Sequence, residues 1–238
     1  MNSDRILRMR DLGDPEFTVE KGILGRLGEH PRIVRLLGSR TKFPPGLLFA
    51  EASHGNLQLF LHKYGKEMTH SLRRKFFRQA IESIAFIHSK GVIHSDLRPD
   101  NFLVHGTWPG SLDLWLCDFG GSVCAELNLD GHQLPDSGFY DPNAPFESSE
   151  VVDIFSLGSV LYTIVTGHWP FRATTGHFDF YGNEREEYEA HVDSRFAKGI
   201  FPDVEGLFGG EIMLSCWTYK FSNAAEIIAR ADQLTMDL

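Results

Sequence analysis

The segment Asp153–Val165 restricts the fold more than any other part of the chain, because its residues are apolar on almost every side of a helix. A helix of that kind is buried all round, in the core of a large domain or in a membrane. The stretch Ile154–Val165 is only about half as long as the roughly 20 residues that span a membrane. The segment therefore predicts a helix at the centre of a helical body, and residues 185–238 suggest three further helices.

The N-terminal part reads as one helix followed by strands. Asp14-Pro15-Glu16 is a favourable helix start, because it offers an N-cap, a proline at the first helical position and an acid in the first turn. Apolar residues then recur at helical spacing until Gly28, which stands where a left-handed residue would end the helix. Two strands are expected next, Ile33–Leu37 and Gly46–Glu51, separated by a pair of prolines.

The middle of the chain predicts a helix, a hairpin and a long loop. Apolar residues recur at helical spacing over Leu72–His88. Phe102–Val104 and Leu112–Cys117 read as the two arms of a hairpin around the turn at residues 107–110. Residues 120–150 are rich in turn-forming residues and show little periodicity, so a long loop is expected, and such loops are usually functional or mobile.

Charge and cysteine content exclude several classes of protein. The net charge of −9 argues against a nucleic-acid-binding surface and against attachment to an anionic membrane. Three scattered cysteines are too few for a disulfide framework and read as reduced thiols. The charged start of the chain has no apolar core of a secretory signal. We therefore expect an intracellular protein, cytoplasmic or nuclear.

Three polar residues stand in loops at the ends of regular elements, where side chains can converge on a cleft: Asp96, Asn101 and Asp118. Two carboxylates and an amide oxygen suit Mg²⁺, which takes only one or two carboxylates from the protein and keeps several waters. Arg98 lies close by and offers a fixed positive fork to phosphate oxygens. This combination fits phosphoryl transfer better than acyl transfer, because no serine or cysteine here has a convincing base partner.

The run His94-Ser95-Asp96-Leu97-Arg98-Pro99-Asp100-Asn101 resembles the catalytic loop of eukaryotic protein kinases, and Asp118-Phe119-Gly120 is similar to their metal-binding triplet. Four further segments match the family in order: Glu20 in VEKGIL with the αC helix, Phe49-Ala50-Glu51-Ala52 with the gatekeeper and hinge, residues 153–158 with the start of the buried αF helix, and Cys216-Trp217 near the C-terminus. The segments TGHWPF and GIFPDVEGLFGGEIMLSCW are similar to those of fungal serine/threonine kinase-like proteins.

The resemblance implies a role for each site residue. Asp96 would accept or orient the proton of the substrate hydroxyl, and Arg98 would stabilise charge on the transferred phosphoryl group. Asn101 and Asp118 would hold the two Mg²⁺ ions that bridge the phosphates of ATP. Asp153 would be structural and accept backbone N–H bonds from the catalytic loop. The residues expected around the nucleotide are Leu103 under the adenine ring, the backbone of Ala50 and Ala52 at its edge, and Glu20 as the αC glutamate.

The expected fold is α+β and protein-kinase-like. It has a truncated N-lobe, with an αC helix and a short sheet in residues 1–51, and a mainly helical C-lobe in residues 52–238. Residues 1–14 hold neither a G-x-G-x-x-G loop nor the strand lysine of the family, so ATP binding should be weakened and catalysis poor. Three family strands would be missing. The remaining two-stranded sheet is marginal alone, and Met1–Asp14 or a partner would have to cover its edge.

Two further departures concern control and substrate docking. Ser95 replaces the arginine that commonly pairs with a phosphorylated activation loop, so control through phosphorylation of Ser122 or Ser137 is not expected. The Ala-Pro-Glu end of the activation segment is also blurred. Asp141-Pro142-Asn143 has the better spacing to the buried helix, whereas Ala144-Pro145-Phe146-Glu147 has the better letters.

Three functions remain open on these residues. The first is an ATP- and Mg²⁺-dependent serine/threonine kinase that acts on a protein substrate. The second is a pseudokinase, a scaffold that binds a protein partner without turnover, which the missing lysine and phosphate loop favour. The third is a small-molecule phosphotransferase of similar fold, against which the kinase-like C-terminal half with Cys216-Trp217 argues.

Overall fold

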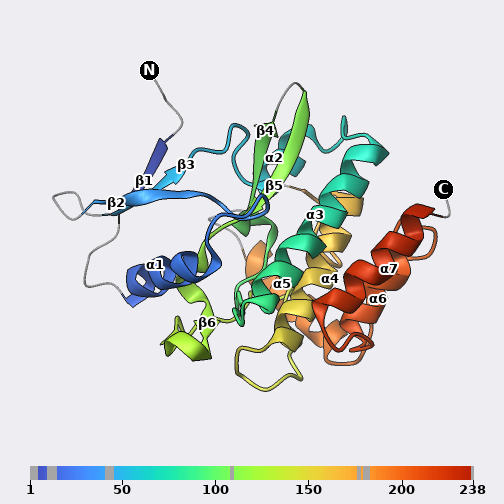
Figure 1. Ribbon diagram of the computed structural model, residues 1–238. Helices are drawn as coiled ribbons and strands as arrows, with labels where there is room; N and C mark the ends of the chain where they lie inside the picture. The colour runs from blue at the N-terminus through green and yellow to red at the C-terminus, as the bar shows by residue number, and fades with distance from the viewer. Residues whose placement is uncertain are drawn as a thin grey trace.

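The structure, a computed structural model, describes residues 5–9, 15–40, 46–107, 110–175, 178 and 183–236. Figure 1 shows a small part with a sheet and one helix, joined to a larger part that is mainly helical. This arrangement confirms the expected α+β class. The described helices of the larger part are α2 (Leu57–Tyr64), α3 (His70–Ser89), α4 (Glu150–Thr166), α5 (Glu184–Phe196), α6 (Gly210–Trp217) and α7 (Ala224–Met236).

The helix of the small part, α1 (Pro15–Leu27), begins at the proline that marked its start in the sequence. The expected N-cap, Asp14, lies outside the described residues. Gly28 ends the helix as predicted, with a left-handed φ of 67° and its N–H 3.0 Å from the carbonyl of Leu24. The buried face of α1 carries Glu20 among apolar side chains, and this places a carboxylate inside the protein.

The sheet of the small part has three strands, one more than the sequence predicted. β1 (Arg5–Met9), β2 (Leu36–Arg40) and β3 (Gly46–Ala50) are antiparallel in the order β1-β3-β2. β1 pairs along the whole of β3, from Arg5 opposite Ala50 to Met9 opposite Gly46. The expected two-stranded remnant was therefore wrong. Of the two ways foreseen to cover its open edge, the structure shows the one that uses the N-terminal residues.

The predicted strand Ile33–Leu37 begins three residues late, at Leu36, because residues 32–34 pair elsewhere. The N–H of Val34 donates to the carbonyl of Leu116 at 2.9 Å, and the N–H of Leu116 donates to the carbonyl of Arg32 at 2.8 Å. Leu116 ends β5 (Ser111–Leu116), a strand of the larger part. These two bonds therefore join the loop after α1 to the large part of the molecule.

The predicted hairpin is confirmed as β4 (Phe102–Thr107) paired with β5 from Phe102 opposite Leu116 to Thr107 opposite Ser111. Trp108 and Pro109 of its turn lie outside the described residues. The expected long loop contains a short hairpin that the sequence did not predict, β6 (Val123–Cys124) with β7 (Leu129–Asp130). Single 3₁₀ turns at 119–121 and 125–127 flank β6.

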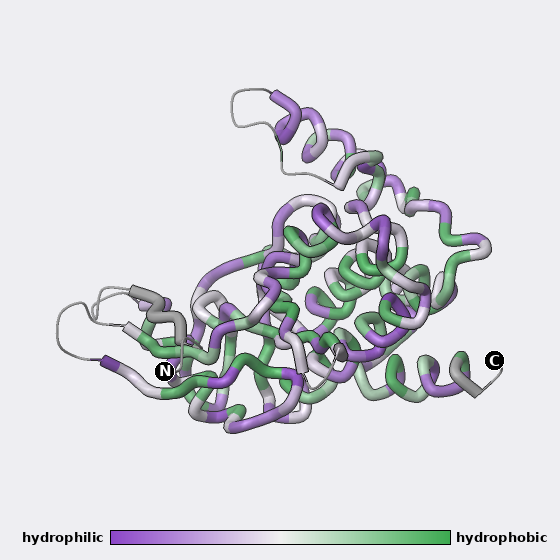
Figure 2. The backbone as a smooth tube through the Cα atoms, turned by 90° about the horizontal axis from the view of Figure 1, so that it is seen from above, coloured by the Kyte–Doolittle hydropathy of each residue, from purple (hydrophilic) through white to green (hydrophobic). Residues whose placement is uncertain are grey.

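The apolar segment that opened the sequence analysis forms α4, and it is buried as predicted. Every residue from Val152 to Ile164 is buried. α3 and α6 pack against it (Figure 1). The helix begins at Glu150, earlier than expected, because the hydroxyl of Ser149 accepts the N–H of Val152 at 3.3 Å. Figure 2 shows α5, by contrast, as a mostly hydrophilic helix at the edge of the molecule.

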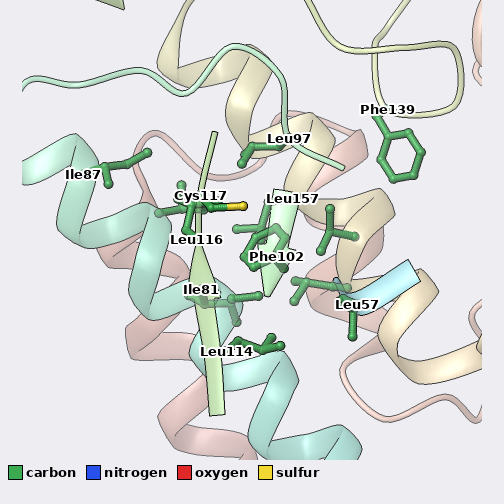
Figure 3. Packing of buried hydrophobic residues seen from close by; sticks show 14 of the residues in the cluster. Leu57, Ile81, Ile87, Leu97, Phe102, Leu114, Leu116, Cys117, Phe139 and Leu157 are labelled. Carbon is green, nitrogen blue, oxygen red and sulfur yellow. The ribbon is translucent and has the colours of Figure 1, made fainter. Parts of the chain in front are cut away.

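The core of the large part lies around the β4–β5 hairpin. Figure 3 shows Phe102, Leu114 and Leu116 of the hairpin packed among side chains of three helices. The helical side chains at this contact are Leu57 of α2, Ile81 of α3 and Leu157 of α4. Leu97, in the loop between α3 and the hairpin, is also fully buried. The loop that carries the candidate site residues is thus held by the core itself.

Helix α2 was not predicted, although the sequence contains its signal. The side chain of Asn56 accepts the N–H of Leu59 at 2.8 Å and caps the helix. Leu57, Phe60 and Leu61 follow at helical spacing and are buried. The turn-forming residues at 53–56 are therefore a helix start as well as a turn.

Asp113 on β5 collects several hydrogen bonds that tie the hairpin to α3. Its Oδ1 lies 2.8 Å from Nζ of Lys75 and accepts the amide of Gln79 at 2.5 Å. The hydroxyl of Thr107 also donates to its carboxylate. Burial opposes ionisation, but these hydrogen bonds outweigh it and lower the pKa of Asp113 far below its ordinary value. The carboxylate is also 3.4 Å from Arg32, so it stabilises the loop after α1 as well.

Asp113→Asn, which removes this charge, should lower the free energy of unfolding at pH 7 by about 1.5–3 kcal/mol. Because the pKa is lowered in the folded state, the stabilisation is present above the pKa of an unfolded aspartate, about 3.9. It is lost as the pH falls from there toward the folded-state pKa. Urea unfolding of both proteins should therefore show a stability difference that shrinks below about pH 4. A difference that stays constant down to acid pH would contradict this account.

Candidate active site

The buried carboxylate of Asp153, in the first turn of α4, holds the loop after α3. It accepts the backbone N–H groups of His94 at 2.7 Å and Ser95 at 2.9 Å, and lies 2.9 Å from Nε2 of His88. Asp153 has no exposed surface. Ser95 adopts a left-handed conformation, with φ 70°, that directs both N–H groups to one carboxylate. The structural role expected of Asp153 is confirmed by these bonds.

His94 links this loop to the strand end that carries Asp118. Its Nε2 lies 3.0 Å from the carbonyl oxygen of Cys117, and its ring centroid is 5.1 Å from that of Phe119. The N–H of Asp96 is 3.4 Å from Nδ1 of the same ring. The fully buried ring therefore sets the distance between the two loops.

Asp96 and Asn101 are in direct contact. The amide nitrogen of Asn101 donates to the backbone carbonyl of Asp96 at 2.7 Å and to its carboxylate at 3.0 Å. The N–H of Cys117 donates to the carbonyl of Asn101 at 2.9 Å, and Asp118 is the next residue of the chain. Burial raises the pKa of the Asp96 carboxyl above its ordinary value. A partly buried carboxylate with a raised pKa is suited to accept a proton.

A cavity of about 180 Å³ lies between the small sheet, α1 and the hairpin. Five residues expected around the nucleotide line it: Glu20, Ala50, Ala52, Leu103 and Asp118. Its other lining residues are Val34, Phe49, Gly55 and Cys117. Cavities for drug-sized ligands usually measure about 300–1,000 Å³, so this one would enclose only part of a nucleotide.

Arg98 does not line that cavity, and neither do Asp96 and Asn101. The guanidinium of Arg98 instead donates to the carboxylate of Asp136, and its Nε lies 3.5 Å from Asp100. Asp136 drew no attention in the sequence, because it belongs to no motif. Val34 lies within the predicted strand Ile33–Leu37, whereas Gly55 read only as a turn residue.

The residues expected to hold Mg²⁺ fit such an ion by their chemistry. Asn101 and Asp118 supply one amide oxygen and one carboxylate, and Mg²⁺ fills its remaining positions with water and phosphate oxygens. Because the amide nitrogen of Asn101 is directed at Asp96, its oxygen is the atom left for a cation. Among the described residues no cluster of three or more His, Cys, Asp or Glu side chains could hold a metal.

Comparison with known proteins agrees with this geometry. Residues 8–200, well over half of the chain, match the protein kinase domain. The chain belongs to the protein kinase family. Its similar relatives include the serine/threonine-protein kinase PDK1 of Cryptococcus neoformans var. grubii, which is 31% identical over 190 residues, covering 75% of this chain and 14% of that protein.

Two other relatives are serine/threonine or phosphoinositide-dependent kinases by name. The serine/threonine-protein kinase RAD53 of Saccharomyces cerevisiae is 32% identical over 66% of this chain and 21% of its own length. The 3-phosphoinositide-dependent protein kinase 1 of Rattus norvegicus is 27% identical over 81% of this chain and 34% of its own length. The kinase chain thus spans at most about a third of these relatives. None of its described helices is both long and apolar enough to cross a membrane.

The segment that corresponds to the activation segment of the family, residues 119–149, packs closely against α1. Leu129 of β7 lies where a side chain on Gly22 would point, since a Cβ there would come 2.5 Å from Cδ1 of Leu129. Glu126 of this segment contacts Arg26 of α1. Ser122 is fully buried and donates to the carbonyl of His94 at 3.1 Å. The expectation that Ser122 is not a control site agrees with that burial.

The end of the activation segment is held through Asp141 and Asn143. The carboxylate of Asp141 accepts the hydroxyl of Tyr219, and the side chain of Asn143 donates to the carbonyl of Ala197 at 3.1 Å. Phe146, in the alternative Ala-Pro-Phe-Glu run, is 89% exposed. The run with the better spacing is therefore the one that contacts the helical body.

The contact between α1 and β7 can be tested with two glycines of the same helix. Gly25→Ala should stabilise the kinase by roughly 0.5–1 kcal/mol, because a Cβ there meets nothing within 4 Å and alanine favours helix. Gly22→Ala should give no such gain, since the new methyl group must displace Leu129. Chemical unfolding of the two variants and wild type measures both effects. Equal stabilisation by both substitutions would show that Leu129 does not pack there.

Proposed function

We propose that this chain is the catalytic part of a serine/threonine protein kinase that transfers the γ-phosphate of ATP to a protein hydroxyl. The observation that carries the proposal is the connection between Asp96, Asn101 and Cys117. The amide of Asn101 donates two hydrogen bonds to Asp96, and its carbonyl accepts the N–H of Cys117, the residue before Asp118, which supports a shared site. Asp118 lines the cavity and would connect this polar group to a bound base.

The cavity supports adenine binding by its lining. Val34 and Leu103 offer apolar surface to the faces of a purine ring. The N–H of Ala50 already donates to the carbonyl of Arg35 at 3.0 Å, so it is not available to the base. Ala52, two residues further along the hinge, would then supply the N–H donor. The phosphates would extend from the cavity toward Asp118 and Asn101.

The transfer itself needs a base and stabilised charge. Asp96 would take the proton of the substrate hydroxyl as that oxygen bonds to the γ-phosphorus and the bond to ADP breaks. Arg98 would stabilise negative charge on the transferred group. Mg²⁺ bound by Asn101 and Asp118 would supply neutralisation of the phosphate charge. The substrate is proposed to be a protein, as the family implies.

A second candidate is a scaffold that binds a protein partner without turnover. It is favoured by the small volume of the cavity. The two candidates differ in nucleotide binding and in phosphate transfer, and both can be measured on the same chain.

Asp96→Asn should lower phosphate transfer to a generic protein substrate by at least about 100-fold and leave nucleotide binding unchanged. The variant should fold well, because burial raises the pKa of Asp96, so its negative charge does not stabilise the folded state. Asp203→Asn makes the same change at an exposed carboxylate and should retain wild-type activity. Equal transfer by wild type and Asp96→Asn would refute the role of Asp96 as base.

Nucleotide binding decides between the kinase and the scaffold. ATP with Mg²⁺ at 100 times its dissociation constant should stabilise the wild-type chain by about 2.7 kcal/mol in a thermal-shift measurement. Asp118→Ala should lose the part of this shift that depends on Mg²⁺, whereas Asp130→Asn, at an exposed carboxylate of β7, should keep it. No shift of the wild type at millimolar nucleotide would favour the scaffold.

A further inference from the structure

Asp136, in the activation segment, contacts two arginines from different parts of the kinase. Its Oδ2 accepts a hydrogen bond from Nη1 of Arg98 in the catalytic loop. Its Oδ1 lies 3.5 Å from Nη2 of Arg185, in the first turn of α5. The side chains of Arg98 and Asp136 are each 30% exposed, so their ion pair is partly shielded from solvent. One carboxylate thus connects the catalytic loop to a peripheral helix.

The backbone around Asp136 is fixed by its neighbours. The N–H of Phe139 donates to the carbonyl of Asp136 at 3.0 Å, and the ring of Phe139 is fully buried against Trp169. The hydroxyl of Ser156 on α4 donates to the carbonyl of Phe139 at 2.5 Å. The hydroxyl of Ser137 donates to Asp193 of α5 at 2.9 Å. Asp136 is therefore presented to Arg98 from a well-held stretch of chain.

The position at which a phosphorylated activation loop would find its arginine is occupied by Ser95. The hydroxyl of Ser95 is buried and has no hydrogen-bond partner among the residues that the structure describes. Ser122 is buried and Ser137 is bonded to Asp193. An anion that holds this segment to the catalytic loop cannot pair with an arginine at position 95. The arginines in contact with Asp136 are Arg98 and Arg185.

We propose that Asp136 is a positioning residue that takes the place of a regulatory phosphate. Its carboxylate holds the activation segment against the catalytic loop and fixes the guanidinium of Arg98 near the acceptor site. This inference rests on the proposed phosphate transfer, because Arg98 is assigned there to the transferred group. An arginine that is already held in place loses less freedom in the transition state than a mobile one. The kinase would then need no phosphorylation of this segment for activity.

The kinetic test compares four variants with wild type, on protein whose folding has been checked by unfolding. Asp136→Ala should lower kcat by about tenfold and change KM for ATP by less than about twofold, because Arg98 acts on the transferred group. The kcat of Asp136→Asn should lie between those of wild type and Asp136→Ala. Asp136→Glu should retain most of the wild-type kcat. Asp130 lies in the same segment but contacts His132, so Asp130→Asn should have the same kcat and KM as wild type. An unchanged kcat in Asp136→Ala would overturn the proposal.

A second measurement does not depend on turnover. Residues 119–149 contain no lysine or arginine, so chymotrypsin is used in place of trypsin. Cleavage after exposed Phe146 serves as the internal reference for cleavage after buried Phe139 and half-buried Tyr140. The ratio of cleavage after Phe139 and Tyr140 to cleavage after Phe146 should rise several-fold in Asp136→Ala and stay unchanged in Asp130→Asn.

The two measurements separate the inference from the function on which it rests. Equal cleavage ratios in wild type and Asp136→Ala would overturn the hold of Asp136 on the segment, whatever the activity. A wild-type chain that transfers no phosphate would refute the proposed function. A raised ratio in that case would still show that Asp136 holds the activation segment, but its positioning role in catalysis would be overturned.

Discussion

The buried carboxylate of Asp153 is the contact on which the geometry of this kinase depends. A carboxylate without exposed surface is tolerated only when its oxygens are fully hydrogen-bonded, and here two backbone N–H groups and a histidine ring surround it. Because Asp153 belongs to α4, the most buried helix of the chain, the loop that it holds cannot move without disturbing the core. This polar loop is therefore held in place by the buried helix to which it is hydrogen-bonded.

The hydrogen bonds that follow from this contact extend to both sides of the cavity. His94, positioned by Asp153, sets the place of Cys117, and Asn101 bonds to both Asp96 and Cys117. The hairpin that carries Leu103 ends at Leu116, where the loop after α1 is bonded. The small part of the molecule is therefore joined to the large part at the same strand that leads into Asp118. The hairpin forms one side of the cavity. The loop after α1, on the opposite side, is hydrogen-bonded to the last residue of that hairpin.

Sequence prediction succeeded where the signal was local and failed where it was not. The buried helix α4 was predicted from an uninterrupted apolar segment, whereas the roles of Asp96, Asn101 and Asp118, drawn from a contiguous run and a triplet, stay a prediction. β1 was missed because Arg5 and Arg8 hide the strand pattern and its pairing depends on a partner more than 35 residues away. Asp136 was missed because its meaning lies in two distant arginines. Ile33 and Val34 read as the start of a strand, and they are absent from the small sheet because this stretch of chain pairs with Leu116 instead.

The extra strand also changes what the small part can do. A two-stranded sheet is marginally stable in water, and β3 would then carry the cavity residues Phe49 and Ala50 on an open edge. Pairing with β1 makes β3 the central strand, so its backbone groups have partners on both sides. The wall of the cavity is thus as well supported as a short sheet allows.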